Sequence, residues 1–238
     1  MYFAGLRCPH RLSDLPLTHD QGVESIVFLT TLGGLFLACG MTQKALKIAN
    51  AEGGHPKPAT TSSSKCLWHR FVNKAQLFGT WGPPHVYIIG TALNRMEQPD
   101  WFSDWALPTF DLGFGGIAIV KTLACVVNGA AICLAYHSFK HLGNNFCFTG
   151  VREKTKTVET GPYSVIRHPL YASILLAQAS WAWMWWSYIP LVGLGLSAIS
   201  FAAKIPIEER IREEDPLTGV EYSSYSKKVK YRLIPYVW

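Results

Sequence analysis

A stretch of 36 residues, Leu170 to Ile205, carries no charged side chain except Lys204. A single membrane-crossing helix needs only ~20 apolar residues to span the ~30 Å hydrocarbon layer, so this stretch is long enough for two. The sequence Tyr188-Ile189-Pro190 near its middle suits a turn. Several Trp residues precede that turn, between 181 and 186, and such side chains gather at membrane surfaces. The stretch therefore predicts a transmembrane helical hairpin whose turn and Trp cluster lie at a membrane surface.

Three further apolar runs precede the hairpin, and they cover Val23 to Met41, Ala75 to Asn94 and Leu112 to Phe139. The second is broken by Gly82-Pro83-Pro84, which neighbouring helices can accommodate in a bundle. Only 16% of the residues are charged, whereas about 25% is usual in soluble domains. We therefore predict an all-α, polytopic membrane protein with about five transmembrane helices and a C-terminal helical hairpin.

The charges between these runs predict an orientation. Lys and Arg are frequent between the first two runs, at 42–74, whereas Asp and Glu dominate after the second run. The positive-inside rule then puts 42–74, 140–169 and 206–238 in the cytosol, and the N-terminus outside. The net charge of +6 fits this arrangement better than nucleic-acid binding, because the cations lie between apolar runs and not on one basic domain.

The chain is expected to divide into two regions. Residues 1–111 would form an N-terminal transmembrane region with the cytosolic loop 42–74, and residues 112–238 would carry the chemistry. Within the loop, residues 51–64 (AEGGHPKPATTSSS) have the composition of a flexible segment without chemistry. The six Cys form no CxxC pair and no Cys/His cluster of metal-binding spacing, so no metal is expected.

The most informative polar segment is Gly161 to Tyr171, GPYSVIRHPLY, directly before the hairpin. Gly161-Pro162 favours a turn, and Pro169 is tolerated in the first turn of a helix. Arg167 offers a planar guanidinium that suits a carboxylate. A simpler interpretation is that Arg167 anchors the chain at the membrane surface, as basic side chains commonly do.

A second polar segment follows the hairpin and contains the pairs Glu208-Glu209 and Glu213-Glu214. Carboxylates beside an anionic membrane face need a cationic or hydroxyl-bearing partner. The alternative is a solvated helical turn in which Glu pairs with Arg three or four residues away. Which pair belongs to a site stays open at this stage. The tail beyond, with EYSSY at 221–225 and RLIP at 232–235, could form a lid.

The motifs GPYSVIRHPLY, IPIEER, EYSSY and RLIPYVW, in this order, resemble the isoprenylcysteine carboxyl methyltransferase family and its phospholipid methyltransferase relatives. The resemblance covers roughly residues 112–238. It implies a helical protein of the endoplasmic reticulum membrane that binds S-adenosylmethionine on its cytosolic side. It also implies methylation of the carboxylate of a prenylated C-terminal cysteine, in a protein or a small molecule, which enters from the bilayer among the membrane lipids.

S-adenosylmethionine has a carboxylate that suits Arg, a ribose diol that suits Glu, and an adenine that suits an apolar slot. The sequence has no strand followed by a Gly-rich turn that would indicate the soluble Rossmann mode of binding. The resemblance instead assigns catalytic roles to Arg232, Glu209 and His168. The cofactor contacts that it implies are Gly161, Pro162, Tyr163, Arg167, His168, Pro169, Tyr171, Glu208 and Glu209.

The acceptor decides whether a base is needed. A carboxylate is already ionised at neutral pH, so alignment and removal of water would suffice, with Arg232 holding the acceptor. The amine of phosphatidylethanolamine must first lose a proton, and His168 or a glutamate would then act as base. We favour the carboxylate, because the paired glutamates, EYxxY and RLIP look closer to the isoprenylcysteine branch. A phospholipid N-methyltransferase, a methyltransferase of a small isoprenoid acid and a non-catalytic lipid-binding scaffold remain the alternatives.

Overall fold

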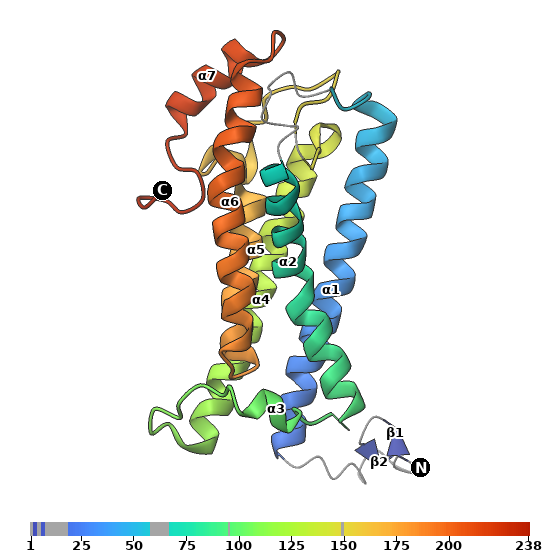
Figure 1. The fold of residues 1–238 in the computed structure, drawn as a ribbon, viewed down its shortest axis with the longest axis vertical. Coiled ribbons are helices and arrows are strands. Elements are labelled where there is room, and N and C mark those ends of the chain that lie inside the picture. Colours follow the sequence, from blue (N-terminus) through green and yellow to red (C-terminus); the bar gives the residue numbers. More distant parts are fainter. Residues whose placement is uncertain (1, 4–5, 8–18, 58–66, 95, 149) are drawn as a thin grey trace.

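The computed structural model describes residues 2–3, 6–7, 19–57, 67–94, 96–148 and 150–238. Five long helices form an elongated bundle (Figure 1), and they are α1 (His19–Glu52), α2 (Leu67–Leu93), α4 (Gly113–Leu142), α5 (Pro169–Met184) and α6 (Ile189–Glu213). The shorter elements are β1 (Tyr2–Phe3), β2 (Leu6–Arg7), α3 (Asp100–Ser103), the 3-10 turns η3 (Gly143–Asn145) and η4 (Gly161–Ser164), and α7 (Gly219–Lys228). The predicted helical fold is confirmed.

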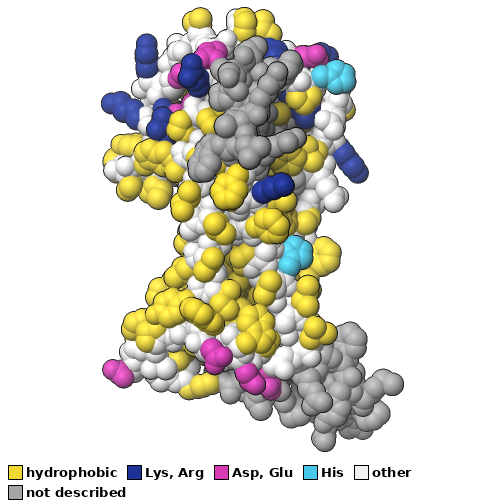
Figure 2. Space-filling model, in the orientation of Figure 1, with side chains coloured by type: hydrophobic (Ala, Val, Ile, Leu, Met, Phe, Trp, Pro, Cys, Tyr) yellow, Lys and Arg dark blue, Asp and Glu magenta, His cyan; other side chains and the backbone are white. Residues whose placement is uncertain are grey.

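The surface of the bundle suits a membrane. Three described segments are long and apolar enough to cross one, namely Gly22–Glu52, Gly113–Asn145 and Ile189–Glu213. Large apolar side chains such as Leu29, Val126 and Ile199 are exposed on these helices, and a soluble protein would bury so broad an apolar surface. Figure 2 shows hydrophobic side chains over the waist of the molecule. Two of the five predicted spans, α2 and α5, are not among these three apolar segments, yet both pack within the same bundle.

The two ends of the bundle carry opposite charges. The end that holds residues 44–57, 140–168 and 206–238, here called the basic end, gathers Lys and Arg side chains (Figures 1 and 2). The opposite, acidic end holds α3 and the turn between α5 and α6, and Asp and Glu appear on its visible face. The described parts of the predicted segments 42–74, 140–169 and 206–238 thus lie at one end, as predicted, and the charge segregation is the one that the positive-inside rule describes.

Helix α5 is shorter than its neighbours, and this recesses the segment before it into the bundle. Its 16 residues rise ~24 Å, less than the ~30 Å hydrocarbon layer, whereas the 25 residues of α6 rise ~38 Å. Pro169 occupies the first turn of α5, as predicted. The recess brings Arg167 and His168 alongside the last turns of α6 and not beyond them.

Two local predictions are wrong. The turn of the hairpin lies before Ile189, because Ile189 and Pro190 form the first turn of α6, where Pro lacks an N–H that would be unpaired anyway. The Trp cluster is not a surface belt, since Trp185 and Trp186 are buried in the bundle and only Trp183 is largely exposed.

The predicted loop 42–74 is also shorter than expected. Helix α1 continues to Glu52 and α2 begins at Leu67. Residues 53–57 run along residues 151–154, and the buried Arg152 donates to the carbonyl oxygens of Ala49, Gly54 and Phe146. The prediction of a flexible segment is thus wrong for residues 51–57. Residues 58–64 lie outside the described part of the chain.

Candidate active site

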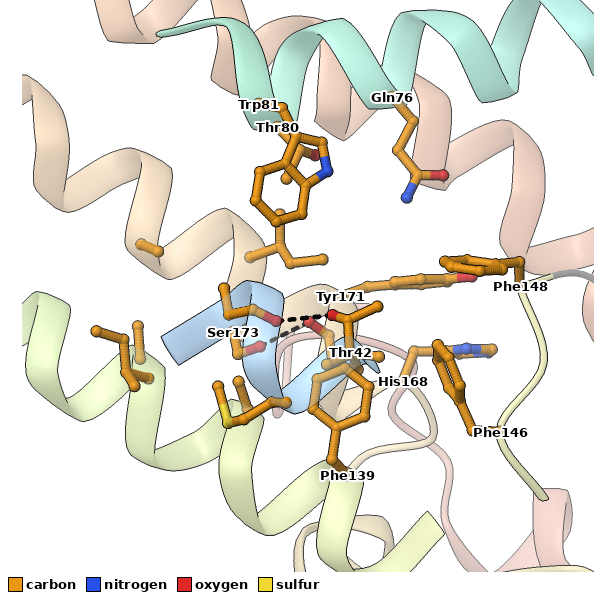
Figure 3. A pocket seen from close by; sticks show the side chains of 18 of the residues that line it. Thr42, Gln76, Thr80, Trp81, Phe139, Phe146, Phe148, His168, Tyr171 and Ser173 are labelled. Atoms are coloured by element: carbon orange, nitrogen blue, oxygen red, sulfur yellow. Dashed lines mark hydrogen bonds between the residues drawn. The ribbon is translucent and has the colours of Figure 1, made fainter. Parts of the chain in front are cut away.

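A cavity of about 440 Å³ runs inside the bundle, in the size range of small-molecule sites. Its polar end lies among Arg167, Tyr171, Glu208 and Arg212, and its inner end reaches Trp181 on α5. Figure 3 shows Gln76 and Trp81 of α2 entering the cavity from one side and Phe139 of α4 from the other. Helices from both predicted regions of the chain, 1–111 and 112–238, therefore line one cavity.

The recessed segment before α5 is held by the C-terminal tail. The backbone N–H groups of Arg167 and His168 donate to the carbonyl oxygens of Tyr231 and Arg232, each at 2.9 Å. The guanidinium of Arg167 donates to the carbonyl oxygens of Ser226 and Val229 at 3.2 and 3.3 Å. The tail therefore packs against the site, as a lid would, and fixes the backbone of the Arg-His pair.

Glu209 is the anionic centre of this arrangement. Its carboxylate accepts from Arg167 Nε at 2.8 Å, from His168 Nε2 at 3.2 Å and from Arg232 Nε at 3.0 Å. Because an ionised carboxylate only accepts, Nε2 of His168 carries a hydrogen. Arg232 also lies over the ring of Trp238, 5.5 Å from its centroid. Glu209 thus joins α6, the segment before α5 and the tail.

Glu208 faces the cavity from the same helix. Tyr171 Oη donates to its carboxylate at 2.6 Å, and Lys204 Nζ lies 3.7 Å away. Lys204 also donates to Gln76 of α2 at 3.1 Å. The ring of Tyr171 is stacked between His168 and Phe201, with centroid distances of 5.6 and 4.3 Å. Tyr171 is therefore held both by stacked rings and by its hydrogen bond to Glu208.

The predicted turn at Gly161-Pro162 is present as η4 and requires glycine. Gly161 has a φ of +61°, and a Cβ there would lie 2.5 Å from the imidazole of His141. The turn buries Tyr163, whose pKa is raised by burial, and Tyr163 lines the cavity. Its carbonyl oxygen accepts from Tyr225 of α7 at 2.7 Å. Gly161 and Pro162 therefore shape the wall without lining the cavity themselves.

Arg212 is a cation of the site that the sequence analysis did not single out. Its side chain is half-buried, lines the cavity and lies over the ring of Tyr222 at 5.7 Å. Within the described residues no carboxylate lies within 4.0 Å of its guanidinium, whereas Arg167 and Arg232 both bind Glu209. Arg212 is therefore the arginine whose charge is available to a ligand. Its neighbour Arg210 points outward and pairs with Glu214, so only the helical phase distinguishes the two.

Three phenylalanines were also missed. Phe139, Phe146 and Phe148 line the polar end of the cavity, with successive ring centroids 5.3 Å apart. The position of Phe146 and Phe148 in an otherwise polar segment between apolar runs could have indicated these two, whereas Phe139 lies within an apolar run and carries no such signal.

The predicted site residues fall into two groups. Those that line the cavity are Tyr163, Arg167, His168, Tyr171 and Glu208. Those that support it from behind or beside are Gly161, Pro162, Pro169, Glu209 and Arg232. The pair Glu208-Glu209 is buried, whereas Glu213 and Glu214 are exposed, so the first pair is the one at the cavity. Among the described residues no group of three His, Cys, Asp or Glu is placed to hold a metal ion.

Comparison with known families agrees with this geometry. Residues 119–214 match the phospholipid methyltransferase family. The match spans most of α4, all of α5 and α6, and therefore Arg167, His168, Glu208 and Glu209, and it ends before α7 and the tail. It confirms the predicted relationship to this family and indicates a membrane methyltransferase. No curated protein matches the chain.

Proposed function

We propose that this protein transfers a methyl group from S-adenosylmethionine to the carboxylate of a prenylated cysteine. The observation that carries the proposal is a single cavity with two chemical characters. Its polar end holds Arg212, which has no carboxylate partner in the described part of the chain, and the remainder, toward Trp181, is mostly apolar. An ionic head group and a hydrocarbon chain can thus be bound side by side. The basic end would face the cytosol, in the endoplasmic reticulum membrane.

The polar end fits S-adenosylmethionine. Arg212 can bind the carboxylate of the cofactor, since a guanidinium and a carboxylate form charge-assisted hydrogen bonds. Glu208 can accept from ribose hydroxyls, and the Phe139, Phe146 and Phe148 rings offer an apolar slot for adenine. When bound, the cofactor supplies the methyl group on a positively charged sulfonium.

The charges of the cavity favour an anionic acceptor. Arg167 and Arg232 share the single carboxylate of Glu209, and Lys204 pairs with Glu208, so the ionisable Lys, Arg and carboxylate side chains at the cavity carry a net positive charge. This excess of positive charge attracts a carboxylate and repels an ammonium group. The tail and the apolar walls exclude water, which raises the free energy of a carboxylate and so its reactivity.

No side chain needs to remove a proton from such an acceptor. Carboxylates are ionised at neutral pH. His168 donates through Nε2 to Glu209, so this nitrogen positions the glutamate and the tail. The acceptor itself would enter from the bilayer, where its prenyl chain is soluble.

The second candidate is N-methylation of a phospholipid, and the family match favours it, because that family is described as phospholipid methyltransferase. Arg212 would then hold the lipid phosphate, and a base would be required for the amine. The base would then be Nδ1 of His168, which lies 4.0 Å from Glu208, because Nε2 already donates to Glu209.

Incubation of the purified protein with labelled S-adenosylmethionine distinguishes these acceptors. N-acetyl-S-farnesylcysteine should yield a base-labile methyl ester, and phosphatidylethanolamine should stay unlabelled. Label in the phospholipid instead would overturn the proposal in favour of the second candidate. If calorimetry detected no binding of S-adenosylhomocysteine, the protein would be a non-catalytic lipid-binding scaffold.

A further inference from the structure

Lys204 is a buried cation in the membrane-spanning part of the bundle. It lies on α6, its side chain is 4% exposed, and it lines the cavity. An ionisable side chain is costly inside a membrane, and those that occur there usually face the bundle interior along the path of a substrate. The contacts of Lys204 therefore indicate what the cavity binds.

The contacts within the protein do not use all the hydrogens of this ammonium group. Lys204 Nζ donates to Gln76 Oε1 of α2 at 3.1 Å. Its nearest described carboxylate, that of Glu208, lies 3.7 Å away, which is an ion-pair distance but too long for a direct hydrogen bond. An ammonium group has three hydrogens to donate, and a buried donor without an acceptor is costly. Among the described residues Lys204 thus has donors left for a ligand.

Lys121, the other lysine with a carboxylate partner within the described bundle helices, differs on each of these points. It donates directly to Glu24 at 3.0 Å, and Glu24 also accepts from Tyr87 and Gln98. It does not line the cavity. This ion pair joins α1, α2 and α4 and suits a structural role. Lys204 instead donates to a neutral amide and faces the cavity.

Lys204 also fixes the orientation of the Gln76 side chain. A lysine ammonium can only donate, so the oxygen of the Gln76 amide must face Lys204. The amide nitrogen then faces away from Lys204, and Figure 3 shows it directed into the cavity. Within the described part of the chain this nitrogen has no acceptor. Ammonium and amide hydrogens are therefore available side by side, and one carboxylate can accept from both.

The position of Lys204 along α6 suits an acceptor. Lys204, Glu208 and Arg212 follow at intervals of four residues on one face of the helix, each about 6 Å from the next along its axis. The proposed function places the cofactor at Glu208 and Arg212. Because α6 runs toward the basic end, Lys204 lies between these two residues and the apolar part of the cavity. The head group of an acceptor whose chain occupies the apolar part would meet Lys204.

We propose that Lys204 and Gln76 form the subsite that binds the carboxylate of the acceptor. This inference rests on the proposed function and names the residues that would select an acid. Arg232, which the sequence analysis expected to hold the acceptor, does not line the cavity, and Arg167 is bound to Glu209. Gln76 lies outside the segment that matches the methyltransferase family, so the N-terminal region would contribute to the choice of acceptor.

The test compares N-acetyl-S-farnesylcysteine with its carboxamide, which has the same chain and nearly the same size but no charge. Calorimetry measures the binding of each to the purified protein in the presence of S-adenosylhomocysteine. Wild type should prefer the acid by about 10- to 100-fold, the effect of charge-assisted hydrogen bonds. Lys204→Met should lose most of this preference. An unchanged preference in Lys204→Met would overturn the inference, as would equal binding of the two compounds to wild type.

Lys74→Met is the matched control. Lys74 is exposed on α2 and does not line the cavity, so this variant removes a lysine charge without the contact and should keep the wild-type preference. A preference lost equally in both variants would show that the effect is not specific to Lys204 and would overturn the inference.

Gln76→Glu guards against loss of folding in Lys204→Met. It keeps the size of a half-buried side chain and its contact with Lys204. The new carboxylate would occupy Lys204 and repel the acceptor, so the preference for the acid should fall by about tenfold or more. The same preference as in wild type would contradict the subsite.

Methyl transfer separates this inference from the proposed function. A preference for the acid that depends on Lys204, without formation of a methyl ester, would overturn the proposed function alone. Methyl transfer to the acid, with a preference that depends on neither Lys204 nor Gln76, would overturn the subsite alone.

Discussion

Gln178 of α5 donates its side-chain amide to the backbone carbonyl oxygen of Gly79 in α2, at 3.0 Å. In a regular helix that oxygen would accept from the N–H of residue 83, but Pro83 has none. Gln178 also donates to Ser197 of α6 at 2.9 Å and is fully buried. One side chain therefore replaces the missing helical donor and joins three helices around the cavity.

Replacing Gln178 by Leu should destabilise the bundle, because the Gly79 carbonyl would be left without a donor in an apolar environment. We expect a loss of about 1–2 kcal/mol in the free energy of unfolding, the upper range for polar contacts between membrane helices. Thermal unfolding in detergent, followed by circular dichroism, measures it. Ser200→Ala is the control, since the hydrogen bond of Ser200 within the described residues goes to Leu196 of its own helix. Equal stability of the two variants would contradict this role of Gln178.

The sequence predicted much of this arrangement, because membrane spans and surface charges are local properties. The apolar runs predicted the helices, and the charges between them predicted that 42–74, 140–169 and 206–238 lie on one side of the membrane. The resemblance to methyltransferases assigned Arg167, His168, Glu208, Glu209 and Arg232 to one site. The structure adds that Glu209 accepts hydrogen bonds from Arg167, His168 and Arg232.

What could not be predicted depends on tertiary packing. Arg210 and Arg212 are equivalent in the sequence, and only the rotation of α6 turns Arg212 to the cavity and Arg210 to solvent. The Trp residues before α6 looked like a surface belt, because composition does not show that Tyr87 of α2 and Phe102 of α3 pack on Trp185. Lys57 looked like part of a flexible loop, because its partner lies 158 positions away.

Lys57 pairs with Asp215 at 2.6 Å and ties residues 53–57 to the end of α6. Burial raises the pKa of Asp215, but hydrogen bonds from Lys57 and Thr218 outweigh it and lower the pKa below its usual value. A lowered carboxyl pKa contributes stability that is present above the unfolded pKa of about 3.9 and is lost as the pH falls through the folded pKa.

Asp215→Asn should therefore be less stable than wild type at neutral pH, by about 1 kcal/mol. The difference should shrink as the pH is lowered below about 4, because wild type then loses the same charge. Unfolding temperatures measured from pH 7 to pH 3 test this. Glu214→Gln removes an exposed ion pair and should show no comparable pH dependence. A constant difference across this range would show that the charge of Asp215 is not responsible.

Glu209→Gln should release the C-terminal tail. The change keeps the size of the side chain but leaves Arg167 and Arg232 without their anion, and breaking a largely buried ion pair costs about 3 kcal/mol. Limited proteolysis should then cleave after residue 229 faster than in wild type, and affinity for S-adenosylhomocysteine should fall because Arg167 and His168 lose their anchor. Glu214→Gln, at the residue that directly follows α6, should behave as wild type in both measurements. Unchanged proteolysis of Glu209→Gln would show that the tail is held by other contacts.

Arg212→Gln should weaken binding of S-adenosylhomocysteine. The effect should be larger than that of Arg210→Gln, the change of the other arginine on α6. A charge-assisted hydrogen bond contributes about 1.5–3 kcal/mol, so the dissociation constant measured by calorimetry should rise by about 10- to 100-fold. Arg210→Gln is the matched control, because among the described residues this exposed side chain pairs with Glu214, and the variant should bind as wild type does.

Arg167→Ala should also lose binding, but with a lower unfolding temperature, since it removes the bonds to Glu209 and to the tail. Arg212→Gln should keep the wild-type unfolding temperature to within a few degrees, because no described carboxylate depends on it. Loss of affinity in Arg167→Ala alone, with Arg212→Gln unaffected, would return the cofactor carboxylate to Arg167.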